Sequence, residues 1–526
     1  MQPVNVVLVG GGGREHALAR ALLRSPRLGK LWITHPENPG LAALGTPVDI
    51  PVNRREIYRL RTFCAKNDIG LVVIGPEDPL AEGFVDELST PDTLVFGPTA
   101  AGAQIEADKV WCKSLLRSAS VAVAEGRGFT DHHQARAALE GKIKDDKVLF
   151  TALGPMRQFE TGDEKREFIL SKLGAALDAA APRGKPNALE PRARAALSIA
   201  FACGDSFRTP DDRAAFIDNL IRTDATIAKA ATTPLSDLPV IKAAGLAKGK
   251  GVVVPSTYAD CLATITDMMV KKIHGAAGEQ IVVEERLEGP EASVLAITDG
   301  RTIVSLPVCQ DHKRLLDGDK GPNTGGMGVF CPSPNVSDDL LMTIEREVLV
   351  PTVDALKRDK INYKGVLFAG LMLTAGGPKV LEYNCRFGDP ETQPLMARLK
   401  SDLLELLLAT CKGTLDEVIL EWDSSAACCV VLASEGYPDK PRLGAVISGV
   451  EAAEKMPGIT IDHAGTRRNA EGELVVGGGR VLCVTGLGAT AREARARAYA
   501  ACEAIRFSGK IMRSDIGLAA AAAAVA

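Results

Sequence analysis

The chain of 526 residues has few aromatic side chains and little net charge. Phe, Trp and Tyr make up 4% of the residues, and the formal net charge is −4. Nucleic-acid-binding proteins generally present a basic surface or aromatic rings for base stacking, so we expect no nucleic-acid partner. A hydrophobic fraction of 46% is typical of a globular protein. A chain of this length is expected to form about three or four domains.

Other common sequence signals are also missing. No apolar stretch approaches the roughly 20 residues of a membrane helix, so we expect no membrane partner. The N-terminal apolar run VNVVLVG is short and leads directly into glycines, which argues against a signal peptide. The 12 cysteines include no CxxC pair and no Cys/His cluster at zinc spacing. Free thiols in a reducing compartment are therefore expected, and we predict a cytoplasmic protein.

The chain changes character several times along its length. Residues 1–105 alternate apolar strands with helices, which predicts a parallel α/β sheet. Residues 126–236 are rich in Ala, Arg, Asp and Lys at helical spacing and predict a helical insertion. Residues 237–420 return to strands and glycine loops, and residues 421–519 form a last α/β unit. The alanine-rich tail at 520–526 is expected to be flexible.

The segment VLEYNCRFGDPETQP, residues 380–394, begins like a buried strand but carries several charged side chains. Side chains of a strand alternate between two faces, so Glu382, Asn384 and Arg386 are predicted to share one face. The opposite, core-like face would hold Leu381, Tyr383, Cys385 and Phe387. Gly388-Asp389-Pro390 is expected to end the strand. An amphipathic surface strand would explain the pattern equally well.

The segment VGGGGREHAL, residues 9–18, places four glycines between a strand and a helix. Such a turn points backbone N–H groups and a helix N-terminus at an anion, usually a phosphate. A tight turn without a ligand is the alternative. The dinucleotide pattern GxGxxG fits poorly, because Glu15 or His16 stands where the third glycine belongs. We therefore expect a phosphate here rather than a dinucleotide.

Three later segments carry further candidate chemistry. In VIKAAGLAKGKGVVV, residues 240–254, Lys242 lies in a predicted strand before a glycine–lysine loop that could cover a triphosphate, although a solvated turn also fits and no Walker A pattern is present. In IVVEERLEGPEASV, residues 281–294, an acidic strand end could contact adenine and ribose or simply end a hairpin. The loop QDHKRLLDGDKGPNTGGMGVF, residues 310–330, is long enough to predict a function.

The chain resembles the glycinamide ribonucleotide synthetases of the ATP-grasp superfamily. The resemblance rests on segments that occur in this order: GGGGREHAL, HPENPG, VIGPEDPL, FGPTAAGAQIEADK, IKAAGLAKGKGV, VVEERLEGPEAS, QDHKRLLDGDKGPNTGGMG, EYNCRFGDPETQP and GGRVLCVTGLG. It covers nearly the whole chain except residues 126–236 and the tail. It implies an α/β multidomain ligase with a Rossmann-like domain over 1–105, an ATP-grasp domain over 106–420 with an ATP lid at 237–280, and a C-terminal domain over 421–519.

The resemblance also implies an activity. Such an enzyme uses ATP to join glycine to 5-phosphoribosylamine, giving glycinamide ribonucleotide, ADP and phosphate in de novo purine synthesis. The reaction would pass through glycyl phosphate. Glycine and 5-phosphoribosylamine are the implied partners, and other purine-pathway enzymes are candidate partners. Because the chain ends after its last α/β unit, we expect it to be monofunctional.

Roles for single residues follow from the same resemblance. Glu382 and Asn384 match positions that hold Mg²⁺, with Mn²⁺ as an alternative. Arg386 is expected to stabilise the transferred phosphoryl group or bind the glycine carboxylate, and Asp311, Lys313 and Arg314 are expected to orient glycine or the amine. The implied ATP-binding residues are Lys109, Lys242, Gly249, Lys250, Gly251, Glu284, Glu285, Leu287 and Glu291. The implied substrate-binding residues are Gly12, Gly13, Arg14, Asn38, Gly40, Pro76, Glu77 and Asp389.

Two positions depart from the family pattern. Ala244 stands where relatives usually have an acidic residue, and Lys248 stands where they have a small one, so nucleotide affinity or loop closure could differ. Two other functions would account for parts of the sequence. A Rossmann-type oxidoreductase would rest on the first glycine loop alone. A nucleotide-binding module without catalysis is disfavoured because Glu382, Asn384 and Arg386 are all present.

Overall fold

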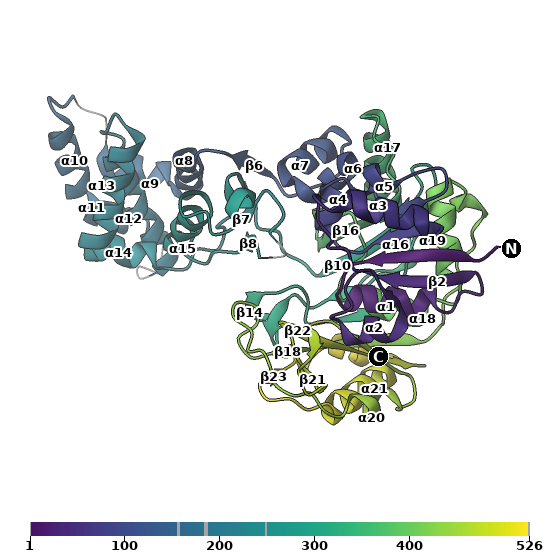
Figure 1. Cartoon of the computed structure of the whole chain (residues 1–526). Coiled ribbons are helices and arrows are strands. Elements are labelled where there is room, and N and C mark those ends of the chain that lie inside the picture. The colour runs from purple at the N-terminus through teal and green to yellow at the C-terminus, as the bar shows by residue number, and fades with distance from the viewer. Residues whose placement is uncertain (1, 155–157, 183–187, 248–249, 524–526) are drawn as a thin grey trace. The chain divides into compact units, whose positions relative to one another are not determined.

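The computed structural model describes residues 2–154, 158–182, 188–247 and 250–523 (Figure 1). These residues divide into two compact units. Unit 1 comprises Met1–Val123, Lys248–Lys250 and Leu287–Ala526. Unit 2 comprises Ala124–Ala247 and Gly251–Arg286.

Unit 1 begins with a parallel sheet in the order β3-β2-β1-β4-β5. Its strands are β1 Val4–Val9, β2 Leu28–Ile33, β3 Thr46–Pro47, β4 Ile69–Ile74 and β5 Leu94–Phe96. The helices of this region are α1 Gly13–Leu22, α2 Pro39–Leu44, α3 Ile57–Lys66, α4 Glu77–Ala81, α5 Phe84–Leu88, α6 Ala100–Ala107 and α7 Lys109–Ser118.

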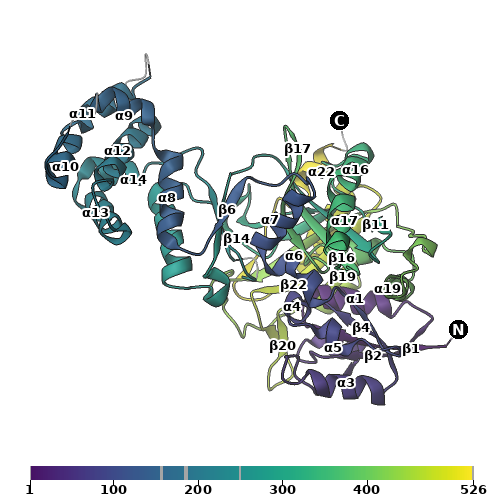
Figure 2. The same ribbon diagram turned by 90° about the horizontal axis from the view of Figure 1, so that it is seen from above.

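This parallel sheet is buried on both faces, with α1 and α3 on opposite sides (Figure 2). Val7 of β1 belongs to a core cluster that includes Leu60 of α3. Its neighbour Leu8 belongs to another cluster, which includes Leu18 of α1. Burial on both faces is typical of parallel sheets covered by helices. It confirms the predicted α/β fold of the N-terminal region.

Two antiparallel sheets follow in unit 1. The first, in the order β11-β10-β16-β17, contains β10 Glu291–Thr298, β11 Ile303–Ser305, β16 Gly365–Thr374 and β17 Gly377–Asn384. The second, in the order β12-β15-β18-β22-β19 with β23 beside β18, contains β12 Gln310–Asp311, β15 Gly328–Cys331, β18 Ala426–Ser434, β19 Ile459–His463, β22 Arg480–Gly488 and β23 Lys510–Ile511. Two hairpins are formed by β13 Arg314–Leu316 with β14 Lys320–Asn323, and by β20 Thr466–Arg468 with β21 Leu474–Val476.

The second sheet carries helices on both faces. The later helices of unit 1 are α16 Asp338–Ile344, α17 Val350–Arg358, α18 Thr392–Arg398, α19 Leu403–Lys412, α20 Val450–Glu454, α21 Ala491–Ala504 and α22 Leu518–Ala523. Cys428 of β18 lies in the core cluster of α21, whereas Cys429 lies in the cluster of α18. Because β12 and β15 join this sheet, the loop at 310–330 is anchored to strands that lie about one hundred residues later in the chain.

The strand that begins at Gly377 is shorter than the sequence predicts. It ends at Asn384, so Arg386 lies just beyond it. The pairing with β16 shifts between Gly370 and Leu371, and Leu381 is only half-buried. The predicted core face is therefore wrong at Leu381, because this irregularity interrupts the alternation. The other three residues of that face, Tyr383, Cys385 and Phe387, are buried.

Unit 2 combines a sheet in the order β6-β9-β7-β8 with a helical segment. Its strands are β6 Gly126–Phe129, β7 Val240–Ala243, β8 Val252–Val253 and β9 Ile281–Glu284. Its α-helices are α8 His132–Ile143, α9 Asp146–Leu153, α10 Gly162–Ser171, α11 Leu173–Ala179, α12 Leu189–Gly204, α13 Pro210–Thr223, α14 Ala225–Ala231 and α15 Tyr258–Ile265. The prediction of a helical insertion from residue 126 is wrong at its start, because Gly126–Phe129 pairs with β9 as a strand.

The C-terminal tail is also more ordered than predicted. Residues 520–523 belong to α22, whose Ala520 packs in the core cluster of α21. Residues 524–526 lie outside the described ranges. In the part of the chain that the structure describes, no helix is both long and apolar enough to cross a membrane.

Candidate active site

The polar residues of β17 lie beside a lysine of the 310–330 loop. Lys313 Nζ lies 3.8 Å from Glu382 Oε1 and 3.3 Å from Glu291 Oε2. The Glu291 carboxylate raises the pKa of Lys313 above its usual value, so the ammonium stays charged. Asn384 lies two residues after Glu382 on the same strand. This edge of the sheet therefore gathers two carboxylates, an amide oxygen and one cation.

The donor set of β17 fits a hard divalent cation. Carboxylate and amide oxygens are ligands that Mg²⁺ accepts, usually with one or two protein ligands plus phosphates and water. Within the described residues, no group of three or more His, Cys, Asp or Glu side chains could hold a metal ion. Because phosphates and water can complete the coordination of Mg²⁺, Glu382 and Asn384 could bind a metal ion that shares its coordination with the oxygens of a bound ligand.

Asp311, at the end of β12, presents a buried carboxylate oxygen. No hydrogen-bond donor among the described residues reaches its Oδ1 atom. Burial raises the pKa of Asp311 above its usual value, and the nearby Glu391 raises it further. Gly326, with φ +110°, lies so close that a Cβ atom there would be 2.9 Å from Asp311 Oδ1. Glycine is therefore needed at this turn.

The Arg386 guanidinium is bound within the protein by several acceptors. Its Nε atom donates to Glu77 Oε2 at 3.2 Å, and its Nη2 atom donates to Glu106 Oε1 at 2.9 Å and to Asn384 Oδ1 at 3.1 Å. Burial raises the pKa of Glu106, although Arg386 opposes this shift. Burial also acts on Glu77, but Arg386 holds the pKa of Glu77 below its usual value. Arg386 thus links the end of β17 to α4 and α6.

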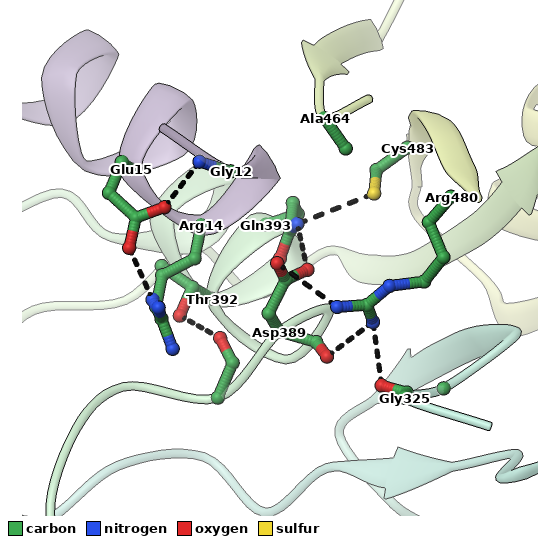
Figure 3. Close-up of polar contacts among 12 residues, drawn as sticks. Gly12, Arg14, Glu15, Gly325, Asp389, Thr392, Gln393, Ala464, Arg480 and Cys483 are labelled. Atoms are coloured by element: carbon green, nitrogen blue, oxygen red, sulfur yellow. Dashed lines mark hydrogen bonds and ion pairs between the residues drawn. The ribbon is translucent and has the colours of Figure 1, made fainter. Parts of the chain in front are cut away.

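The N-terminus of α1 is capped by a side chain of its own first turn. Gly12 N donates to Glu15 Oε2 at 2.7 Å, and Arg14 Nε donates to Glu15 Oε1 at 2.7 Å (Figure 3). A Cβ atom at Gly10 or Gly75 would collide with Glu15. The glycines thus make room for a buried carboxylate at the place where the sequence predicts a phosphate. The role of Gly12 and Gly13 in binding a substrate stays a prediction.

Other predicted substrate residues contribute to packing in unit 1. Asn38 Nδ2 donates to Gly11 O and to His463 O, both at 2.8 Å, and its Oδ1 accepts from Gly40 N at 3.0 Å. A Cβ atom at Gly40 would collide with His16 and His463. Asn38 and Gly40 therefore join the N-terminal sheet region to β19.

The remaining predicted residues of this side contact backbone or begin a helix. Arg14 Nη1 donates to Phe387 O at 3.1 Å, and Arg314 Nη1 donates to Gly321 O at 2.7 Å. Pro76 is the N-cap residue of α4, which begins at Glu77. These contacts leave the proposed substrate roles of the four residues untested.

The predicted ATP-binding residues are divided between the two units. In unit 2, Lys242 Nζ lies 2.5 Å from Glu284 Oε1, and both side chains are buried. Glu285 N donates to Glu125 O at 2.7 Å, and Gly251 O accepts from Ala243 N at 2.7 Å. Ala244, which replaces an acidic residue of the family pattern, is buried.

In unit 1, Lys109 is the first residue of α7. Lys250 Nζ donates to Pro438 O at 2.8 Å, and Leu287 is half-buried. Glu291 begins β10 and pairs with Lys313. Gly249 and Lys248 lie outside the described residues.

A buried acidic residue lies beside the first helix. Asp462 of β19 lies 3.5 Å from His16 Nδ1 and 4.0 Å from Arg20 Nη1. Neither of its carboxylate oxygens has a hydrogen-bond partner among the described residues. Burial raises the pKa of Asp462 to about 7, Arg20 opposes this, and Asp389 and Glu454 add to it. Burial lowers the pKa of the adjacent His16 to about 3, so this imidazole is neutral at pH 7.

Asp462→Asn is expected to stabilise the protein more at pH 8 than at pH 5. Because the pKa of Asp462 is about 7 when folded against 3.8 ordinarily, the folded state loses stability as the pH rises between these values. Asparagine does not titrate, so the variant avoids this loss. We expect the increase in the free energy of unfolding to be on the order of 2 kcal/mol larger at pH 8 than at pH 5. Chemical denaturation at both pH values measures it. The exposed Asp416→Asn serves as the control, and an equal gain at both pH values for Asp462→Asn would contradict the expectation.

The sequence interpretation missed several residues of this region. Arg480 of β22, Glu391 and Gln393 near Asp389, and Glu106 of α6 all contact predicted site residues or lie beside them. Arg480, Glu391 and Gln393 fall inside segments that resemble the family, GGRVLCVTGLG and EYNCRFGDPETQP. A charged residue at the start of the apolar strand RVLCVTG was the available signal for Arg480.

Comparison with known families finds matches in three parts of the chain. Residues 4–106 match the phosphoribosylglycinamide synthetase N domain, residues 211–392 its ATP-grasp (A) domain, and residues 427–519 its C domain. A phosphoribosylamine–glycine ligase of Rhodopirellula baltica is 40% identical over 98% of both chains. The corresponding ligase of Escherichia coli strain K12 is 36% identical, again over 98% of both.

Two solved structures are also similar to this chain. The crystal structure of phosphoribosylamine–glycine ligase from Thermotoga maritima is similar with a TM-score of 0.66 and 27% identity, over 98% of this chain and 100% of that one. The biotin carboxylase domain of Hydrogenobacter thermophilus 2-oxoglutarate carboxylase is similar with a TM-score of 0.58 but only 14% identity, over 97% of this chain and 92% of that one. The second likeness concerns the fold alone.

Proposed function

The chain belongs to the phosphoribosylglycinamide synthetase family, and from that premise we propose how its residues carry out the family's reaction. It is an ATP-dependent ligase that joins glycine to 5-phosphoribosylamine and forms glycinamide ribonucleotide in purine biosynthesis. The observation that carries this is the match to the family's N, ATP-grasp and C domains in order, with a relative 40% identical over nearly the full length of both chains. The family and activity predicted from the sequence are thereby confirmed.

The reaction needs an activated carboxyl group. A carboxylate resists attack by an amine because its oxygens are poor leaving groups. In the proposed first step, a glycine carboxylate oxygen bonds to the γ-phosphorus of ATP, and ADP leaves. In the second step, the amine of 5-phosphoribosylamine bonds to the carbonyl carbon, phosphate leaves, and the amine loses a proton. The protein contributes positioning and charge neutralisation, and no covalent enzyme intermediate is required.

Glu382 and Asn384 would hold a divalent metal ion, which we propose to be Mg²⁺, with Mn²⁺ as an alternative. When bound, such an ion neutralises phosphate oxygens and polarises the phosphorus that is attacked. Lys313, close to Glu382, remains charged and adds a second positive charge at this edge of the sheet. The buried Oδ1 of Asp311 can accept a hydrogen bond from the incoming amine and so orient it.

We propose the following roles for other residues predicted from the sequence. Arg386, already bound by Glu77, Glu106 and Asn384, acts by fixing the end of β17 and by offering positive charge to the glycine carboxylate or the phosphoryl group. Lys109, Lys242 and Lys250 neutralise ATP phosphates, and Glu284, Glu285, Leu287 and Glu291 contact adenosine. Asp389 and the turn at Gly12 and Gly13 bind 5-phosphoribosylamine.

We also propose a cytoplasmic location. The support is the state of the cysteines, all of which are free, and all but Cys411 of which are buried. Free thiols fit a reducing compartment. The proposed partners are the small-molecule substrates, and contacts with other purine-pathway enzymes rest on the family resemblance alone.

The proposal is tested by measuring ADP release from the purified chain. Release over many turnovers should require both glycine and 5-phosphoribosylamine, and glycinamide ribonucleotide should form in equal amount. Removal of divalent metal with a chelator should stop the reaction, and added Mg²⁺ should restore it. Sustained ADP release that depends on another amino acid, or that continues over many turnovers without 5-phosphoribosylamine, would show that the substrate assignment is wrong.

A further inference from the structure

Arg480, at the start of β22 in the C-terminal sheet, contacts two separate turns of the site region (Figure 3). Its Nη1 atom donates to Gly325 O and to Asp389 O, both at 2.6 Å. Its Nη2 atom lies 3.3 Å from Asp389 Oδ2. A single side chain therefore joins the GPNTGGMG turn to the turn after β17.

The Asp389 carboxylate is held on a second side by α18. Gln393 Nε2 donates to Asp389 Oδ1 at 2.9 Å, so each carboxylate oxygen has its own partner. Burial acts to raise the pKa of Asp389, but Arg480 keeps it below its usual value, and the carboxylate is charged. A Cβ atom at Gly12 would lie 3.4 Å from Asp389 Oδ2. The charged oxygen thus faces the turn at the start of α1.

The turn at Gly325 is held from both sides by the C-terminal sheet region. Gly325 N donates to Tyr437 OH at 3.0 Å, while Gly325 O accepts from Arg480. The next residue, Gly326, packs against Asp311 and Pro390. Arg480 therefore lies between Asp389 and the turn that contacts Asp311.

Arg480 is poorly placed to bind a phosphate directly, because its N–H donors already contact other protein groups. A guanidinium has five N–H donors, and both donors on Nη1 are used by backbone carbonyls, while Nη2 faces Asp389. We propose that Arg480 is a positioning residue for the acceptor half of the reaction. It fixes the Asp389 carboxylate against the Gly12 turn, where the ribosyl hydroxyls or the amine of 5-phosphoribosylamine bind. This inference rests on the proposed function.

Arg480→Lys keeps the positive charge but cannot span Gly325 O and both acceptors of Asp389. We expect the KM for 5-phosphoribosylamine to rise at least tenfold, while the KM for ATP, the KM for glycine and kcat change by less than threefold. Binding of the product, glycinamide ribonucleotide, measured by calorimetry, should weaken by a similar factor. Arg497→Lys is the matched control, because Arg497 also donates to a carbonyl and pairs with a glutamate, but on α21. It should leave all of these values unchanged.

The double variant tests whether Arg480 acts through Asp389. Asp389→Asn keeps the shape of the side chain and removes its charge. If Arg480 acts through this carboxylate, Arg480→Lys combined with Asp389→Asn should weaken product binding little more than Asp389→Asn alone. The proposal would be overturned if the double variant weakened product binding by the product of the two single factors. An equal rise in all three KM values of Arg480→Lys would overturn it as well. If the unchanged protein released no ADP with glycine and 5-phosphoribosylamine, the proposed function would fail instead.

Discussion

Glu382→Gln is expected to lower the rate of glycinamide ribonucleotide formation at least about 100-fold while the protein remains folded. The substitution keeps the shape of the side chain but removes a negative charge from the predicted metal site. It also leaves Lys313 with one fewer carboxylate nearby. Steady-state assays over a range of Mg²⁺ concentrations measure the effect. Partial recovery at high Mg²⁺ is expected if weaker metal binding limits the variant.

Cys385→Ser is the control for Glu382→Gln. Cys385 lies just beyond the end of the same strand, is buried in a core cluster, and has its thiol pKa raised by burial. Serine at this position should lower stability modestly and leave kcat nearly unchanged. Full activity of Glu382→Gln, or an inactive but folded Cys385→Ser, would show that the functional groups lie on the other face of the strand.

Of the single substitutions predicted for this protein, Arg386→Gln is expected to lower the free energy of unfolding the most. It removes the guanidinium that Glu77 and Glu106 share and leaves two carboxylates with little exposure close together. Breaking a buried ion pair in this way typically costs about 3–5 kcal/mol. Chemical denaturation of the purified variant measures the loss. Arg346→Gln removes an exposed pairing with Glu347 and should change the free energy of unfolding by less than about 0.5 kcal/mol.

A second substitution separates charge from packing at this site. If uncompensated charge causes the loss, adding Glu106→Gln to Arg386→Gln should recover part of the stability, because one buried carboxylate is then removed. Glu106 is chosen because burial raises its pKa above the usual value and Arg386 opposes this shift. If Glu106→Gln destabilises the protein further, the lower stability of Arg386→Gln results from lost packing and not from uncompensated charge.

The sequence correctly predicted several strands and helices, and it identified the family. Alternation along residues 380–387 correctly places Tyr383, Cys385 and Phe387 in the core, because the side chains of an extended chain alternate between faces. The same reasoning fails at Leu381, where the pairing of β17 with β16 shifts, and local spacing carries no information about such a shift. The parallel α/β sheet at the N-terminus was predictable from apolar strands separated by helices.

The glycine turn shows where local pattern was insufficient. Four glycines before a helix predict an anion at its N-terminus, and the structure places a carboxyl group there, but it belongs to Glu15 of the same helix. Both a phosphate and a side-chain carboxylate satisfy the same N–H donors. The pattern therefore predicted that the N–H donors of the turn bind an acidic group. It did not determine whether that group is a phosphate or a side chain of the protein.

By itself, the sequence determined the family, the order of the motifs, and the residue types that this ligation needs, because these are properties of consecutive residues. Only the tertiary structure decided that Arg386 is bound by Glu77 and Glu106, and that Arg480 holds Asp389 from 91 residues away. Contacts of this kind arise when sheet pairing and helix packing bring distant segments together. Their buried charges then need partners that no local spacing specifies.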